Sequence, residues 1–87
     1  MIVSELQDFD EGIRYAAAEA LIGIDDSSVR EPLAQALAKT GEESNRLRVR
    51  IAEAFHQRNW PLGEHAATIG QRPPTGFAVQ GDRIQRV

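Results

Sequence analysis

The sequence predicts an all-α fold, namely a fragment of an α-solenoid with about one and a half helix-pair repeats and a short C-terminal cap or β-hairpin. Three observations predict it: three segments have helical apolar spacing, two of them match when Asp10 is laid over Ser44, and Pro and Gly crowd the last third of the chain. We expect a partial preceding helix or docking segment over 1–9, helical repeats over 10–58 and a cap over 59–87.

The first full helix is predicted to begin after Asp10, which is a good N-cap, and to end at Gly23. Its alanines give it high helix propensity and thin side chains, so that other helices can approach closely. Its apolar residues lie on one stripe at helical spacing, and they are Ile13, Ala17, Ala20, Leu21 and Ile24.

A second helix is predicted to start near residues 29–31, because Pro32 is tolerated in a first turn, where its missing N–H costs nothing. It should run to about Lys39 and stop at Thr40-Gly41. Its expected apolar stripe is Leu33, Ala36 and Leu37.

A third helix is predicted to follow Ser44 as its N-cap, with an apolar stripe of Leu47, Ile51, Ala54 and Phe55. The shift that lays Asp10 over Ser44, which we call the repeat offset, also matches Arg14 with Arg48 and aligns residues 10–21 with residues 44–55. Because a period of this size is typical of a helix pair, the two segments are interpreted as the first helices of two successive units.

The chain then departs from this pattern. Trp60-Pro61 follows the third helix, and the glycines and prolines between 63 and 76 leave room for at most two helical turns around residues 64–69. The last eleven residues are predicted to form a short hairpin that turns at residues 80–82. Its candidate anchors are Phe77, Val79, Ile84 and Val87.

Residues 10–39 resemble one unit of the HEAT-like repeats related to those of phycobilisome lyases, with Asp10 through Leu21 as the first helix and Glu31-Pro32-Leu33 opening the second. Residues 44–58 resemble the first helix of another unit. The resemblance implies structural roles, in stacking between units, for Asp10, Arg14, Ser44 and Arg48. Ser44 stands where the family has Asp, which weakens any bridge to an arginine there. The resemblance also implies scaffolding or partner docking.

Charge divides unevenly along the chain. Residues 1–43 hold ten acids and three bases, a net of −7, whereas residues 44–87 hold seven arginines and three acids, a net of +4. The two halves could attract each other between copies, or the basic half could meet an acidic partner, or solvated helix faces could simply differ in charge. The absence of cysteine favours a reducing compartment, so we expect a cytoplasmic protein, and no apolar run is long enough to span a membrane.

The sequence shows little that is typical of an enzyme. His56 and His65 stand outside any spaced metal or catalytic motif, and the glycines are scattered rather than gathered in a phosphate loop. The acid pairs lie at expected helix starts, where negative charge is favourable. We therefore predict no enzymatic activity, no catalytic or metal-binding residues and no cofactor.

We expect instead a protein-interaction module, a small subunit or the end of a larger assembly, because about three units are usually needed for such an array to stand alone. Its partner would be another protein chain or a second copy. The alternatives are weak binding of a nucleic-acid backbone through Arg46 and Arg50, and an accessory role in a bilin-lyase-like enzyme. Trp60 is either an interface anchor or a lid over the end of the Phe55 stripe. The partner-binding candidates are Ile2, Leu6, Phe9, Tyr15, Arg46, Arg50 and Trp60.

Overall fold

The computed structural model describes residues 6, 8–24, 26–39 and 42–87, and they form a mostly helical protein with one small antiparallel hairpin. This confirms the helical class and the hairpin. No helix in these ranges has both the length and the apolar character needed to cross a membrane. The elements in chain order are α2 (Glu11–Gly23), η1 (Ser27–Val29), α3 (Arg30–Ala38), α4 (Asn45–Arg58), η2 (Gly63–His65), α5 (Ala66–Gln71), β1 (Phe77–Gln80) and β2 (Arg83–Arg86).

Helix α2 begins where the sequence predicts, because the Asp10 side chain accepts a hydrogen bond from the backbone N–H of Ile13 at 3.2 Å. Its buried residues are Ala17, Ala18, Leu21 and Ile22. The other residues of the predicted apolar stripe, Ile13, Ala20 and Ile24, are exposed. Neighbouring helices cover only one side of α2, so the other part of its apolar surface stays uncovered.

The next two helices lie close to their predicted bounds. A single turn of 3-10 helix, capped by Asp26, precedes α3, which begins at Arg30 and ends at Ala38. Ser44 caps α4 by accepting from the backbone N–H of Leu47 at 3.3 Å. The whole predicted stripe of α4 is buried, whereas α3 buries Ala34 in place of the partly buried Ala36.

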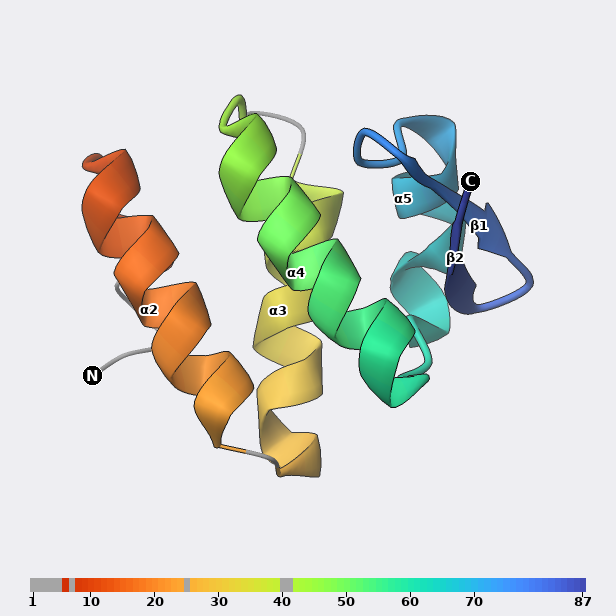
Figure 1. Ribbon diagram of the computed structural model, residues 1–87, viewed down its shortest axis with the longest axis horizontal. Coiled ribbons are helices and arrows are strands. Elements are labelled where there is room, and N and C mark those ends of the chain that lie inside the picture. The colour runs from red at the N-terminus through yellow and green to blue at the C-terminus, as the bar shows by residue number, and fades with distance from the viewer. Residues whose placement is uncertain (1–5, 7, 25, 40–41) are drawn as a thin grey trace.

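Helix α4 occupies the centre of the fold (Figure 1). It runs in the same direction as α2, and α3 runs the opposite way (Figure 1). One side of α4 packs against α2, another against α3, and β2 covers a third. The largest fully buried side chains lie around it, and they are Phe55, Leu33, Leu37, Leu47, Ile51, Leu62, Ile69 and Pro74.

The C-terminal cap consists of η2, α5 and the hairpin, as the sequence predicts. The strands pair antiparallel with Val79 opposite Ile84, and Gly81, with a φ of 63°, lies in the turn between them. Phe77 and Ile84 are buried against the helices, while Val79 is half-buried. Val87 was wrongly predicted as an anchor: it follows the last paired residue and is 87% exposed.

The predicted N-terminal segment is only partly described. Ile2 and Val3 lie outside the described residues. Leu6 is in a turn and is buried in the core, whereas Phe9, a little further along the chain, is fully exposed. Residues 8–10 are not helical, so the part of this segment that the structure describes approaches α2 as irregular chain.

Candidate functional site: the exposed face of α2

One face of α2 is apolar and uncovered. Three of its side chains lie at i, i+3 and i+7 within the helix, which places them on one side of the helix axis. Two more exposed apolar residues flank the helix, one on each end. We call this set the outer stripe, and it consists of Phe9, Ile13, Ala16, Ala20 and Ile24. Phe9 is 103% exposed, and Ile13 and Ile24 are 42% and 47% exposed. Aligned exposed apolar residues are typical of a binding surface rather than of ordinary solvated surface.

The corresponding face of α4 is fully covered. The repeat offset pairs Ile13 with Leu47 and Ala20 with Ala54, and these two residues of α4 are each 1% exposed. Other paired positions are buried on both helices, for example Ala17 with Ile51. On α4 this face packs against α2. No element of the described chain packs against the corresponding face of α2, so the two helices differ there.

The chain leading into each helix also makes the same hydrogen bonds. The Asp8 carboxylate accepts from the backbone N–H of Asp10 at 2.9 Å, and the Glu42 carboxylate accepts from the backbone N–H of Ser44 at 2.9 Å. Asp8 and Glu42 are separated by the repeat offset, like the caps they support. Each acid thus lies beside a helix start.

Arg14 joins the two helix starts. Its Nε and Nη2 donate to the two carboxylate oxygens of Glu42 at 2.9 and 3.1 Å, and its Nη1 donates to the backbone carbonyls of Asp8 and Phe9. Glu42 is 3% exposed and the Arg14 side chain 15%. This bidentate pair is geometrically specific, and it is one of the stronger kinds of hydrogen-bonded contact.

Arg48 corresponds to Arg14 but has no carboxylate in the corresponding position. Its Nη2 donates to the backbone carbonyl of Arg72, and its buried Nε has no hydrogen-bond partner among the described residues. Burial and the nearby Arg72 lower the pKa of Arg48, against the opposing effect of Glu42. The four residues for which the sequence predicts structural roles therefore lie at the helix starts, but Arg14 binds Glu42 rather than the cap Asp10.

Arg46 and Arg50, two of the partner-binding candidates, point from α4 to α2. Arg46 donates from Nε and Nη2 to the carboxylate of Glu11 at 2.6 and 2.7 Å, and Arg50 donates to Glu19 at 3.1 Å. Hydrogen bonds from Arg46 and Ser44 lower the pKa of Glu11 to about 2. Because both guanidinium groups already face carboxylates, they have less positive charge to offer a phosphate backbone.

Tyr15, another candidate, lies in the same α2–α4 contact. The Arg46 guanidinium stacks 4.2 Å from the centre of its ring, a favourable cation–π distance. A hydrogen bond with Glu19 raises the pKa of the Tyr15 hydroxyl. The ring is half-buried, so Tyr15 joins the two helices and presents only part of its surface outward.

Trp60 lies inside the chain. It is 4% exposed, its ring meets that of Phe55 edge-on at 5.4 Å, and the guanidinium groups of Arg30 and Arg58 lie over it at 5.3 and 5.0 Å. The interpretation of Trp60 as an exposed interface anchor does not fit this burial, because an anchor needs accessible surface. Its position fits the alternative, in which it closes the end of the Phe55 stripe.

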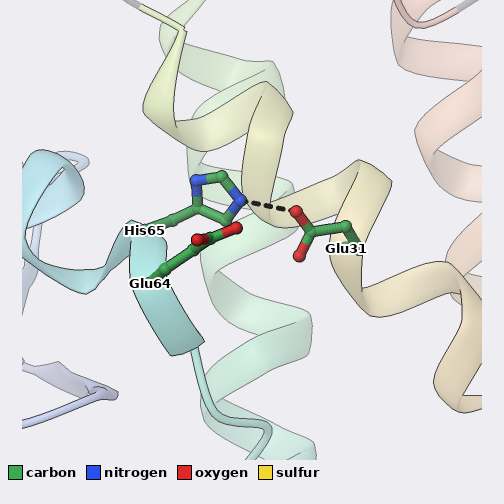
Figure 2. Close-up of side chains that lie close together, drawn as sticks. All are labelled: Glu31, Glu64 and His65. Carbon is green, nitrogen blue, oxygen red and sulfur yellow. Dashed lines mark hydrogen bonds and ion pairs between the residues drawn. The ribbon is translucent and has the colours of Figure 1, made fainter.

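A cluster of possible metal ligands joins α3 to η2. Figure 2 shows Glu31, Glu64 and His65 converging, and one ligand atom from each lies within 4.8 Å of the other two. The His65 Nε2 lies 2.7 Å from the Glu31 carboxylate, which also accepts from Gln35. A nitrogen and carboxylate oxygens are suitable donors for a divalent cation such as Zn²⁺. Both glutamates are exposed, however, and Glu31 and His65 satisfy each other, so we interpret the cluster as a hydrogen-bonded contact between elements.

The sequence missed this cluster, because Glu31 and His65 are far apart in the chain and no spacing motif joins them. His56 packs against the hairpin, with its Nδ1 3.2 Å from the carbonyl of Ile84 and its ring near Phe77. Hydrogen bonds from His65 and Gln35 hold the pKa of Glu31 below its usual value, with His65 the larger cause.

No protein-family model, curated protein or solved structure matches the chain. We therefore infer its function from geometry. What the fold defines is a small helical protein in which one helix has an uncovered apolar face, and the outer stripe is the most extensive feature of this kind among the described residues.

Proposed function

We propose that the chain is a non-catalytic protein-interaction module, the N-terminally open end of a HEAT-like solenoid, and that it binds a helix of another protein along the outer stripe of α2. One observation carries this proposal: Ile13 and Ala20 are exposed, whereas their counterparts Leu47 and Ala54 are 1% exposed beneath a neighbouring helix. A partner helix bound on the outer stripe would bury this face of α2, as the corresponding face of α4 is buried.

The surface suits close helix packing. Gly12, Ala16 and Ala20 carry little or no side chain and are exposed. Small residues of this kind allow a second helix to approach to the short end of the usual separation of about 8–10 Å. Ile13 and Ile24 then provide the bulk that fills the grooves of the incoming helix. Burying these side chains would provide hydrophobic stabilisation in proportion to the area covered.

Charge indicates what the incoming helix carries. The Asp8 carboxylate accepts from the backbone N–H of Asp10, as the Glu42 carboxylate accepts from that of Ser44. Among the described residues, however, no basic side chain forms an ion pair with the Asp8 carboxylate. The Glu42 carboxylate, in contrast, is paired with the guanidinium group of Arg14. We therefore expect the partner helix to place an arginine or lysine against Asp8 and apolar side chains against the outer stripe.

A second copy of the chain fits this surface less well. Two α2 helices packed antiparallel across a twofold axis would bring Asp8 and Asp10 of one copy toward the exposed Asp26 of the other. Like charges so placed repel each other, and no basic residue on the outer stripe compensates them. A chain with basic residues beside its apolar stripe is the better complement.

The experiment places a photo-reactive amino acid at position 13 and, as a matched control, at position 67, an exposed alanine of α5. We expect position 13, but not position 67, to cross-link one cellular protein through an apolar helix that carries Arg or Lys. Asp8→Asn and Ala20→Glu should each reduce that product several-fold. Equal labelling at both positions, or cross-linking only to a second copy, would contradict the proposal.

A further inference from the structure

The contact between Glu31 and His65 joins the starts of two equivalent helices. The two residues are separated by the repeat offset, and each lies where a 3-10 turn leads into a helix, η1 into α3 and η2 into α5. Helix α3 packs against both η2 and α5. The positions of the two side chains are therefore set by packed helices rather than by a loop, as a precise binding site requires.

Glu64 adds a second carboxylate to this contact. Figure 2 shows its side chain converging with those of Glu31 and His65, and one ligand atom of each lies within 4.8 Å of the other two. Within the described ranges, no other three acidic or histidine side chains converge in this way. Metal–ligand bonds of about 2.0–2.2 Å in tetrahedral geometry place the ligand atoms about 3.3–3.5 Å apart. Small rotations of the side chains would reach this arrangement.

The three side chains differ in how firmly they are held. The His65 side chain is 19% exposed, and its backbone N–H donates to the carbonyl of Leu62 at 3.3 Å. The Glu31 side chain is 56% exposed, so its carboxylate can turn without displacing neighbours. Gln35 donates to this carboxylate at 3.2 Å, and an outer hydrogen bond of this kind orients a metal-binding group.

Two cavities border the cluster. His65 and Gln35 line one of about 390 Å³, and Glu31 and Gly63 line another of about 250 Å³. A zinc ion with three protein ligands keeps a fourth position for water or another small ligand. The two cavities would give such a ligand access to the cluster.

We propose that Glu31, Glu64 and His65 bind Zn²⁺, with the Nε2 atom of His65 and one oxygen of each glutamate as protein ligands. Imidazole is a good ligand for zinc, whereas Mg²⁺ and Ca²⁺ prefer sites made of oxygen alone. Two carboxylates also balance the two positive charges of the ion. The ion takes the place of the hydrogen bond between Glu31 and His65.

Zinc bound here acts as a cross-link between α3 and the C-terminal cap. It stabilises the folded chain, because the unfolded chain does not hold the three ligands together. The site is independent of the proposed binding of a partner helix, since the outer stripe lies on α2 and the cluster joins α3 to η2.

The test is isothermal titration calorimetry of the whole chain with ZnCl₂ at pH 7, combined with ¹H–¹⁵N NMR of the histidine rings. We expect one equivalent to bind saturably, with the largest ring shift at Nε2 of His65. His56, whose Nδ1 lies 3.2 Å from the carbonyl of Ile84, is the internal reference and should not shift. An excess of MgCl₂ or CaCl₂ should not displace the zinc, and displacement by either would overturn the choice of ion.

Variants of the ligands make the result decisive. Glu64→Gln and His65→Gln should each weaken Zn²⁺ binding about tenfold or more, since even changes to outer hydrogen bonds of metal ligands cost about 10–100-fold. Glu64 is exposed, so Glu64→Gln should leave the thermal midpoint of the metal-free chain unchanged while abolishing its rise with ZnCl₂. Glu43→Gln removes the same charge beyond the other end of α3 and should leave the zinc affinity unchanged. Absence of saturable binding, or equal weakening by Glu64→Gln and Glu43→Gln, would refute the site.

Discussion

Arg14 and Glu42 form a bidentate pair between distant parts of the sequence, with Nε–Oε1 and Nη2–Oε2 distances of 2.9 and 3.1 Å. This pair ties the start of α2 to the chain that enters α4. Because Glu42 is 3% exposed, its carboxylate is stabilised by protein groups in place of water. The same carboxylate accepts from the backbone N–H of Ser44, so one buried acid fixes both the arginine and the cap of α4.

Replacing this acid should therefore be costly. We expect Glu42→Gln to lower the free energy of unfolding by about 2 kcal/mol, because hydrogen bonds that involve charged groups contribute about 1.5–3 kcal/mol. Urea denaturation at pH 7 measures the change. Glu43→Gln, which alters the adjacent exposed carboxylate, is the matched control and should have an effect within about 0.5 kcal/mol. Similar effects of the two substitutions would show that the Arg14 contact adds little.

Glu11 should make stability depend on pH in the acid range. Its pKa is about 2 in the folded chain against an ordinary value of 4.5, chiefly because Arg46 and Ser44 donate to it. A lowered folded pKa means that the unfolded chain takes up the proton first as pH falls. The stabilisation is therefore complete above about pH 4.5 and is lost progressively toward pH 2.

The corresponding measurement follows urea midpoints of the wild type and of Glu11→Gln between pH 7 and pH 2. The two curves should differ most at pH 7 and converge at low pH. Added salt should narrow the difference, because the Arg46 side chain is 60% exposed and the pair is screened. Parallel curves over the whole range would contradict the assignment of the low pKa to Glu11.

The sequence predicted the helices well because their signals are local. Asp10 and Ser44 cap the helices they precede, and Trp60-Pro61 stands where α4 has ended. The stripe of α4 was predicted in full because neighbours cover the helix on several sides. Periodicity shows which side chains share a face, but it does not show whether a neighbour covers that face. For this reason the stripe alone did not show that Ile13 and Ile24 are exposed.

The polar sites were less accessible to sequence reasoning. The Arg14–Glu42 and Glu31–His65 pairs join distant parts of the chain, so they depend on how the helices stack rather than on local spacing. One signal was available: the repeat offset that aligns the helices also aligns Asp8 with Glu42 and places Gly76 where the next acid would stand. Extending the offset beyond the helices would have indicated that Arg48 lacks a carboxylate.

Two glycines of the cap should respond in opposite ways to alanine. At Gly70, in α5, an added Cβ would lie 3.6 Å from the Cβ of Val79, an ordinary van der Waals distance. Gly70→Ala should therefore raise the free energy of unfolding by about 0.5–1 kcal/mol through helix propensity. Gly76 has a φ of 86°, so Gly76→Ala should cost about 1–2 kcal/mol in backbone strain. Thermal or urea unfolding compares them, and a shift of both in the same direction would contradict this reasoning.

The difference in exposure between α2 and α4 can be tested at two positions that the repeat offset aligns, Ile13 and Leu47. Leu47→Ala removes a side chain that is 1% exposed, and we expect it to lower the free energy of unfolding by about 2–5 kcal/mol. Ile13→Ala removes a side chain that is 42% exposed at the equivalent place, and its cost should stay below about 1 kcal/mol. Urea denaturation of the isolated chain measures both values.

When the proposed partner helix is bound, we expect Ile13→Ala to have a large effect, this time on binding. Once Ile13 is covered, its truncation should weaken binding by about tenfold or more, since a buried interface side chain of this size commonly contributes more than about 1 kcal/mol. Leu47→Ala should affect binding mainly through global stability, which thermal unfolding of the free chain measures separately. If Ile13→Ala destabilised the isolated chain as much as Leu47→Ala, then the face of α2 would already be covered without a partner.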